Sequence, residues 1–194
     1  MRFDGVCKLQ RDKKNILNMG CGDRYLKGYI NLDTNKNIKA DVYHDLDLFP
    51  YPFPDNYFDE IIAHNVVEHL KGNPAILYVE LNRILKPNGI LEIRTPHHTG
   101  NGNYNSQDHI KQFGCYSWDY ICYPSHRKGA DFTINKRLFE KVERKLWWCN
   151  ENHGLISKIL SFPANLIPHC IVERTFIYWV GGYDEILIRL KAVK

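Results

Sequence analysis

The 194-residue chain lacks several features that define common protein classes. Its six cysteines form no C-x-x-C pair, which excludes a zinc ribbon and predicts free thiols. The longest run without a charged residue, Ile159 to Val172, has fourteen residues and contains two prolines, so it is too short to span a bilayer. The first residues show no apolar core followed by a small-residue cleavage site, so we expect a cytoplasmic protein.

The composition is that of an ordinary globular protein. Hydrophobic residues make up 44% and charged residues 25%, and the length fits one domain over residues 1–194. The net charge is +4, but the basic residues are spread along the chain, so charge argues only weakly for nucleic acid. Tyrosine and tryptophan concentrate after residue 100, where a substrate surface or a thick core is expected.

Short β-rich runs alternate with turns and helical patterns between residues 14 and 94, which is typical of a parallel α/β sheet. The pattern predicts a short helix that begins near residue 66 and two further helices, over 74–85 and 135–142. It predicts strands at 16–19, 29–32, 42–44, 58–63, 90–94, 145–149 and 185–192.

Two glycines directly after the first predicted strand give the strongest functional signal. Gly20 and Gly22 let backbone N–H groups approach a ligand, and Asp33, at the tip of the next strand, is placed to accept both hydroxyls of a ribose. This pattern favours a nucleoside-containing cofactor, whereas a plain tight turn with a surface acid is the alternative. An NAD site is disfavoured because Tyr25 stands where the dinucleotide motif has its third glycine.

A second acidic position follows the third predicted strand. The carboxylate of Asp45 can accept a hydrogen bond from an adenine amino group, while a backbone N–H near Leu46 meets a ring nitrogen. A cap of a turn or helix is the alternative for this pair. The cofactor interpretation gains support because ligands of open α/β sheets bind outside the carboxyl ends of the strands.

Five segments in order resemble a class I S-adenosylmethionine-dependent methyltransferase of the small, type 11-like kind: LNMGCG, INLD, VYHDL, FPDNYFDEIIAHNVVEHL and LNRILKPNGILEIRTPH. The similarity covers about residues 14–110. It implies a Rossmann-like, doubly wound, seven-stranded and mostly parallel sheet with an antiparallel last strand. Residues 14–94 would then form the cofactor-binding half, 95–183 the substrate-side loops and an insertion, and 184–194 the last strand.

The resemblance also implies which residues contact S-adenosylmethionine. The glycine loop would wrap the methionine part, the acid at 33 would hold the ribose and the pair at 45–46 the adenine. The segment 63–65 would lie beside the methyl group, with the histidine at 69 close behind. The expected cofactor-binding residues are Gly20, Cys21, Gly22, Asp33, Asp45, Leu46, Ala63, His64, Asn65 and His69.

The chain departs from the family pattern in two places. Only eleven positions separate Gly22 from Asp33, so the first crossover must be shortened. An apolar insertion over 153–183 stands where a tight hairpin is usual. This insertion can cap the substrate pocket, form a dimer interface, rest on a membrane surface or thicken the core.

The loop over residues 95–109 carries His97, His98, Asp108 and His109. A histidine here can act as general base toward a substrate hydroxyl or amine. The same loop can instead bind a metal through His97 or His98 with Asp108 and His109, or be simple polar loop structure. The candidate catalytic residues are His109, His97 and His64, and no metal is assigned.

The expected activity is methyl transfer from S-adenosylmethionine to an oxygen or nitrogen of a small molecule, a sugar or a lipid head group. RNA is the competing acceptor, but its one candidate contact, the basic cluster at 126–128, is small. A non-catalytic partner subunit that keeps the cofactor fold is a further alternative, against which the intact Asp33 and Asp45 argue. Peripheral membrane contact and the oligomeric state are left open.

Overall fold

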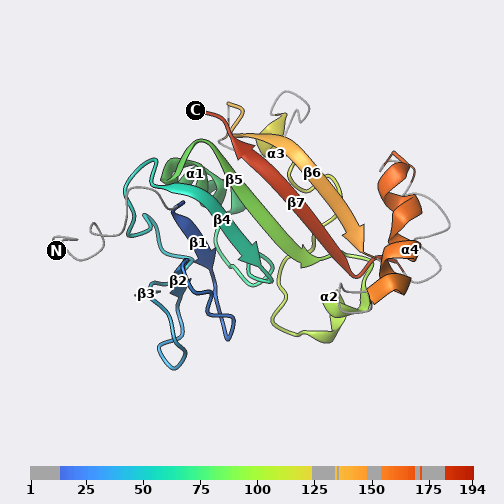
Figure 1. The fold of residues 1–194 in the computed structure, drawn as a ribbon, viewed down its shortest axis with the longest axis horizontal. Helices are drawn as coiled ribbons and strands as arrows, with labels where there is room; N and C mark the ends of the chain where they lie inside the picture. Colours follow the sequence, from blue (N-terminus) through green and yellow to red (C-terminus); the bar gives the residue numbers. More distant parts are fainter. Residues whose placement is uncertain (1–13, 124–133, 135, 148–153, 169–170, 172–181) are drawn as a thin grey trace.

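The computed structural model describes residues 14–123, 134, 136–147, 154–168, 171 and 182–194. Within them, seven strands form one sheet in the order β3-β2-β1-β4-β5-β7-β6 (Figure 1). The strands are β1 (Ile16–Met19), β2 (Ile30–Asp33), β3 (Val42–Tyr43), β4 (Phe58–His64), β5 (Leu85–Pro96), β6 (Phe139–Trp147) and β7 (Glu185–Ala192). The helices are α1 (Pro74–Ile84), α2 (Asn101–Asn105), α3 (Asp119–Cys122) and α4 (Gly154–Leu166).

The sheet has the mixed topology that the resemblance implies. Strands β1 to β5 pair in parallel, whereas β7 is antiparallel to both β5 and β6. On one face Leu17, Ile61 and Leu91 lie in register and are fully buried. Burying a side chain of this size contributes roughly 1.5–3 kcal/mol. The prediction of a seven-stranded, mostly parallel sheet with an antiparallel last strand is therefore confirmed.

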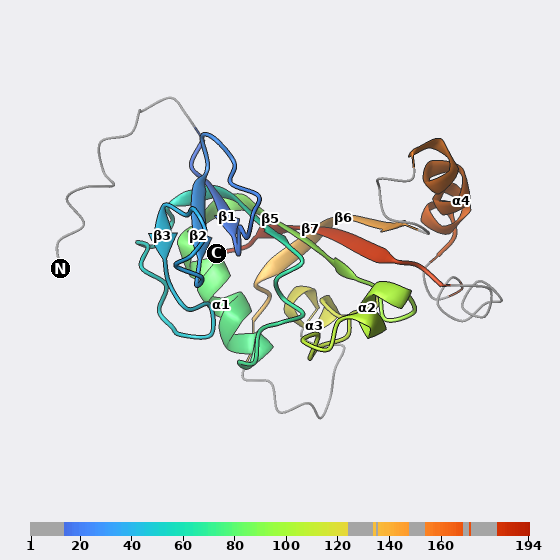
Figure 2. The same cartoon turned by 90° about the horizontal axis from the view of Figure 1, so that it is seen from below.

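Helices α1, α2 and α3 lie together on one face of the sheet (Figure 2). Residues 20–29 connect β1 to β2 through turns without a helix, which confirms the shortened first crossover. Because side chains alternate along a strand, the opposite face carries the polar positions. There Asn18 Nδ2 donates to Asn31 Oδ1 at 3.0 Å, and Arg189 Nε donates to Glu92 Oε2 at 2.6 Å.

Four predicted elements differ in the structure, among them the strand predicted at 145–149, since β6 already begins at Phe139. Residues 67–69 form a turn and not a helix, and α1 begins only after Asn73, whose side chain accepts a hydrogen bond from Ala75 N–H. The predicted helix over 135–142 is wrong, since residues 139–142 belong to β6, where pairing with β7 overrides helical propensity. Strand β5 is longer than the predicted 90–94 and begins directly after α1.

Of the six cysteines, Cys21, Cys115 and Cys122 lie in the described part of the chain, where all three are free and buried. The other three lie outside it. In the described ranges, no helix combines the length and apolarity needed to cross a membrane.

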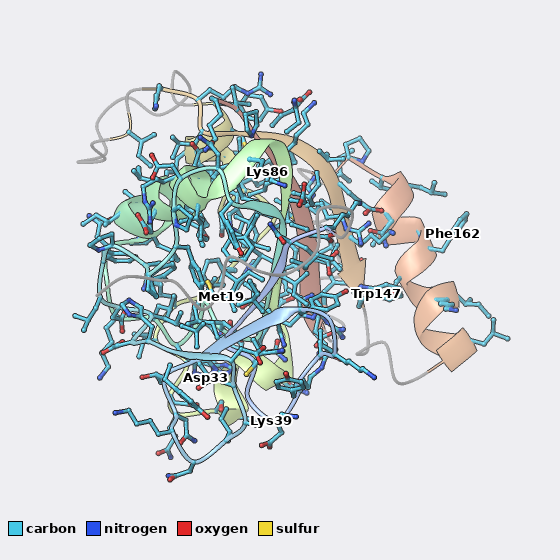
Figure 3. The ribbon with its side chains drawn as sticks, turned by 60° about the vertical axis from the view of Figure 1, so that its left-hand side comes forward. Met19, Asp33, Lys39, Lys86, Trp147 and Phe162 are labelled. Atoms are coloured by element: carbon cyan, nitrogen blue, oxygen red, sulfur yellow. The ribbon has the colours of Figure 1, made fainter. Side chains whose placement is uncertain are left out.

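Helix α4, inside the predicted apolar insertion, is attached to the edge strand β6. Asn165 Oδ1 accepts from Leu146 N–H at 2.9 Å, and Asn165 Nδ2 donates to Leu146 O at 3.0 Å. The outer face of α4 is apolar and exposed, and Figure 3 shows Phe162 projecting from it. The exposed side chains are Leu155, Ile159, Phe162 and Leu166, at 72%, 60%, 62% and 68%. These four do not thicken the core, and the other roles considered for the insertion stay predictions.

The attachment of α4 can be tested by two substitutions of unequal cost. Asn165→Ala leaves the backbone N–H and C=O of Leu146 without these partners, so we expect a loss of about 1–3 kcal/mol in unfolding free energy. Phe162→Ser changes an exposed position and should stay within about 0.5 kcal/mol. Urea denaturation measures both, and equal losses would contradict this placement of the helix.

Candidate functional site

The turn after β1 is shaped by two glycines of different surroundings. Gly20 and Gly22 both have positive φ, 62° and 51°, which side-chain-bearing residues rarely adopt. A Cβ on Gly20 would lie 2.5 Å from Val66 Cγ2, whereas a Cβ on Gly22 would meet nothing within 4 Å. Gly20 therefore permits close packing against the segment after β4, and Gly22 borders space that a ligand can enter.

Asp33 lies at the carboxyl end of β2 and connects directly to this turn. Its Oδ2 accepts from Gly22 N–H at 2.8 Å, and its Oδ1 accepts from Asn35 N–H at 2.9 Å. In Figure 3 Asp33 lies at the end of the sheet opposite Lys86. Because each carboxylate oxygen can accept more than one hydrogen bond, Asp33 keeps the capacity to bind ribose hydroxyls. The glycine turn and the acid are thus joined into one unit.

Cys21, between the two glycines, fixes the turn through its backbone, and its thiol donates to Lys39 O at 3.8 Å. Burial and the nearby charge of Asp33 raise the pKa of the Cys21 thiol, so the thiol stays neutral. Its backbone N–H donates to Leu32 O at 3.0 Å, which fixes the turn against β2.

The pair expected to contact adenine follows β3. Asp45 is exposed, and its Oδ1 accepts from Asp47 N–H at 3.0 Å in a turn. Leu46 is buried, and its carbonyl accepts from the Tyr51 hydroxyl at 2.8 Å. The carboxylate of Asp45 is therefore accessible to a ligand, whereas Leu46 can meet adenine only through its backbone.

The segment after β4 turns sharply at the edge of the sheet. Ala63 is buried in the core, and Asn65, with φ of 56°, donates its N–H to Arg94 O at 2.8 Å. The His64 ring lies on the polar face, with Nε2 2.8 Å from Glu92 Oε1. The backbone of this segment thus follows the carboxyl edge, while the ring of His64 is held by an acid on the sheet.

The contact between His64 and Glu92 predicts a pH dependence of stability. Hydrogen bonds from His64 and then Arg189 lower the pKa of Glu92 from 4.5 to about 2. Because the pKa of Glu92 is lower in the folded than in the unfolded protein, the ionised carboxylate stabilises the fold by roughly 3 kcal/mol when the pH is above 4.5. This contribution is lost as the pH falls from 4.5 toward 2. We therefore expect Glu92→Gln to be less stable than the wild type at pH 6, and the difference to shrink below pH 4.5. Thermal denaturation of both proteins across this range tests it, and a difference independent of pH would refute it.

The histidines of the loop after β5 separate into two groups. His97 is 1% exposed, with Nδ1 2.7 Å from Thr99 Oγ1, and His98 Nδ1 lies 3.3 Å from Phe113 O. A general base must come within hydrogen-bond reach of a substrate proton. The burial of His97 therefore disfavours it in that role.

His109 lies beside His69, with ring centroids 4.7 Å apart. Together with Glu68 they form a group whose potential ligand atoms all lie within 4.8 Å of one another. Among the described residues, this is the group of acidic and histidine side chains that lie close enough together to hold a metal ion. The structure therefore does not bring His97 or His98 into a set of metal ligands with His109. Glu68 is not among the site residues predicted from the sequence, although its position directly before His69 indicates that the two side chains can lie in the same site.

Comparison with known families decides the class of the domain. Residues 17–93 match the family model described as a methyltransferase domain. Over these residues the chain is similar to the methyltransferase domain family. A stretch of 42 residues is also 45% identical to an uncharacterized methyltransferase of Schizosaccharomyces pombe. That stretch covers 22% of this chain and spans only 15% of the length of the yeast protein.

Several solved structures share the fold of this chain at low sequence identity. A SAM-dependent methyltransferase from Archaeoglobus fulgidus aligns with a TM-score of 0.59 and 18% identity over 93% of this chain and 86% of that one. A putative methyltransferase from Bacillus halodurans gives 0.58 and 15% over 92% of each chain. A putative methyltransferase of Haloferax volcanii, in complex with the Trm112 methyltransferase activator, gives 0.57 and 16% over 93% and 83%. The resemblance to class I, type 11-like methyltransferases is therefore confirmed by the family model over residues 17–93 and by the shared fold.

Proposed function

We propose that this methyltransferase domain binds S-adenosylmethionine and transfers its methyl group to an oxygen or nitrogen of a small-molecule, sugar or lipid-head-group acceptor. The observation that carries the proposal is the unit formed by Gly22 and Asp33 at the carboxyl ends of β1 and β2. The fold alone does not fix the reaction, because a [4+2]-cyclase also shares it, with a TM-score of 0.55 and 13% identity. The site residues, and not the fold, therefore favour methyl transfer.

The residues present fit this cofactor. S-adenosylmethionine supplies a methyl group already activated on a sulfonium sulfur. Asp33 can accept the ribose hydroxyls and Asp45 the adenine amino group, and the space beside Gly22 is open. NAD fits less well, because residues 20–29 contain no helix whose N-terminus could bind a pyrophosphate. Tyr25, at the position of the third glycine, instead donates its hydroxyl to Asp41 Oδ1 at 2.8 Å.

A groove beside α1 supports a small acceptor. Its volume of about 330 Å³ lies within the range of ligand pockets, roughly 300–1,000 Å³. It is lined by Pro74, Tyr78, Lys111, Gln112, Phe113, Ser117 and Tyr120. The aromatic rings suit an apolar or planar acceptor more than a nucleic-acid backbone. The basic cluster at 126–128, considered for RNA, lies outside the described residues.

The role of His109 in turnover is tested by substitution. His109 lies in the loop that leads to the groove lining at Lys111, so we expect His109→Ala to slow methyl transfer by about 10²- to 10⁴-fold. Because His109 is not among the residues expected to hold the cofactor, the Kd for S-adenosylmethionine should change less than about twofold. His98→Ala is the matched control and should leave the rate unchanged. A lost cofactor affinity in His109→Ala would contradict this division of roles.

The acceptor class can be found by transfer of a tritiated methyl group. The protein is incubated with labelled S-adenosylmethionine and, separately, with a small-molecule extract, a lipid extract and total RNA, beside Asp33→Ala. Label in the first or second fraction that depends on Asp33 supports the proposal, whereas label in RNA favours the competing acceptor. Cofactor binding without transfer favours a partner-dependent subunit. The Haloferax methyltransferase bound to its activator makes this outcome worth testing with an added partner.

A further inference from the structure

Glu68 is a buried acid with an unusual lack of partners. It is fully buried, and its Oε2 accepts from the Thr95 hydroxyl at 2.9 Å. Its Oε1 is buried without a hydrogen bond. Burying an ionised carboxylate costs several kcal/mol unless a cation or several donors compensate it. One neutral hydroxyl and the backbone N–H of Glu68 itself do not provide that compensation, and burial raises the pKa of Glu68.

A second unpartnered atom lies nearby. Nδ1 of His109 is buried without a hydrogen bond, and the ring of His69 packs against that of His109. Glu68, His69 and His109 each offer one ligand atom within 4.8 Å of the other two, so the cluster brings a carboxylate oxygen and two imidazole nitrogens together where a cation can lie.

Surrounding contacts hold the three side chains in place. His69 Nδ1 lies 3.2 Å from Asp108 Oδ2, a contact that orients this ring. The backbone oxygen of Glu68 accepts from Ile110 N–H at 3.0 Å and Lys111 N–H at 3.1 Å, so the loop that carries His109 is fixed to Glu68. Carboxylates and backbone groups behind metal-ligating imidazoles orient them in this way.

We propose that Glu68, His69 and His109 bind a divalent transition-metal ion. One carboxylate oxygen and two imidazole nitrogens form the donor set of catalytic zinc sites and of non-haem iron sites. Bonds of 2.0–2.1 Å require the ligand atoms to close to roughly 3.3 Å. The side chain of His69 is 34% exposed, which allows its ring to make this adjustment.

The site would leave coordination positions open, since three protein ligands do not complete the shell. Lys111 is joined to Glu68 by its backbone and lines the groove beside α1. This extension rests on the proposed function: an acceptor in the groove would place an oxygen on the ion. The ion would then lower the pKa of that acceptor hydroxyl.

The metal site is tested without any methyl transfer. The full chain is stripped with EDTA, dialysed, and titrated with ZnCl₂ and separately with MnCl₂ by calorimetry, with bound metal counted by mass spectrometry. We expect one ion per chain, and at least a tenfold weaker Kd in Glu68→Gln and in His109→Ala. His98→Ala, which removes an imidazole outside the cluster, should bind like the wild type.

Thermal denaturation separates loss of ligand from loss of fold. Without metal, Glu68→Gln should be at least as stable as the wild type, because the variant removes a buried charge. Added metal should raise the melting temperature of the wild type and leave that of Glu68→Gln unchanged. Absence of binding, or binding equal in all variants, would overturn the site, and the cluster would then be stabilised by a proton.

Titration with S-adenosylmethionine in EDTA distinguishes the two proposals. Cofactor binding without metal binding would leave methyl transfer standing and remove the metal. Metal binding without cofactor binding would remove the proposed function and with it the assignment of the ion to an acceptor.

Discussion

Asp33→Ala is expected to raise the Kd for S-adenosylmethionine by roughly 10- to 150-fold. The substitution removes two hydrogen bonds from ribose hydroxyls to a charged acceptor, which corresponds to about 1.5–3 kcal/mol. It also removes the acceptor of Gly22 N–H, so the glycine turn loses the contact that positions it. Both effects act in the same direction on cofactor affinity.

A matched control separates ribose binding from charge. Asp23→Ala removes the same charge from the adjacent turn, but Asp23 is exposed. We expect its Kd to stay within about twofold of the wild-type value, as measured by calorimetric titration. Equal losses in the two variants would mean that net charge near the turn, and not the carboxylate of Asp33, governs binding.

Gly20→Ala and Gly22→Ala are expected to fail in different ways. A Cβ at residue 20 collides with Val66 and also sits at positive φ, so we expect a loss of about 2–4 kcal/mol of unfolding free energy. A Cβ at residue 22 meets open space, so the cost in stability should be only about 1–2 kcal/mol. It occupies the space that a ligand needs, and the Kd for S-adenosylmethionine should rise more than about tenfold.

Urea denaturation and cofactor titration of both variants test this contrast. The double variant Gly20→Ala with Val66→Ala removes the colliding methyl groups and should recover part of the stability that Gly20→Ala loses. No recovery would show that backbone strain alone sets the cost. A Gly22→Ala protein with unchanged cofactor affinity would show that the ligand does not approach this turn.

The fold was predictable where short-range pattern and long-range pairing agree. Strand β1 is followed directly by a glycine, and β7 alternates buried and less buried residues along its length, so the bounds predicted for both, 16–19 and 185–192, are those of the structure. The segment of β6 alternates weakly, with Val142 exposed, and its register with β7 shifts between Lys141 and Glu143. Its strand state depends on pairing with β7, whose partner residues lie 38 to 53 positions later in the sequence, outside any local window.

The candidate site was predictable in its backbone part and less so in its side chains. The turn at Gly20 and Gly22 and the acid at Asp33 follow from the order of strand, glycine and strand, and the structure joins Gly22 to Asp33. The histidine cluster depends on how the loop after β5 folds back. Hydrogen bonds from Ile110 and Lys111 to Glu68 bring His109 to His69 and leave His97 against Thr99. The spacing of the histidines along the sequence cannot show that the loop folds back onto Glu68.

The central claim is that the carboxyl edge formed by β1 and β2 binds S-adenosylmethionine. The most direct measurement is calorimetric titration of the purified chain with S-adenosylmethionine, S-adenosylhomocysteine and NAD, beside Asp33→Ala. The account predicts micromolar binding of the first two ligands, weaker binding in the variant and no binding of NAD. A folded protein that binds neither S-adenosylmethionine nor S-adenosylhomocysteine, or that binds them equally well without Asp33, would contradict the account.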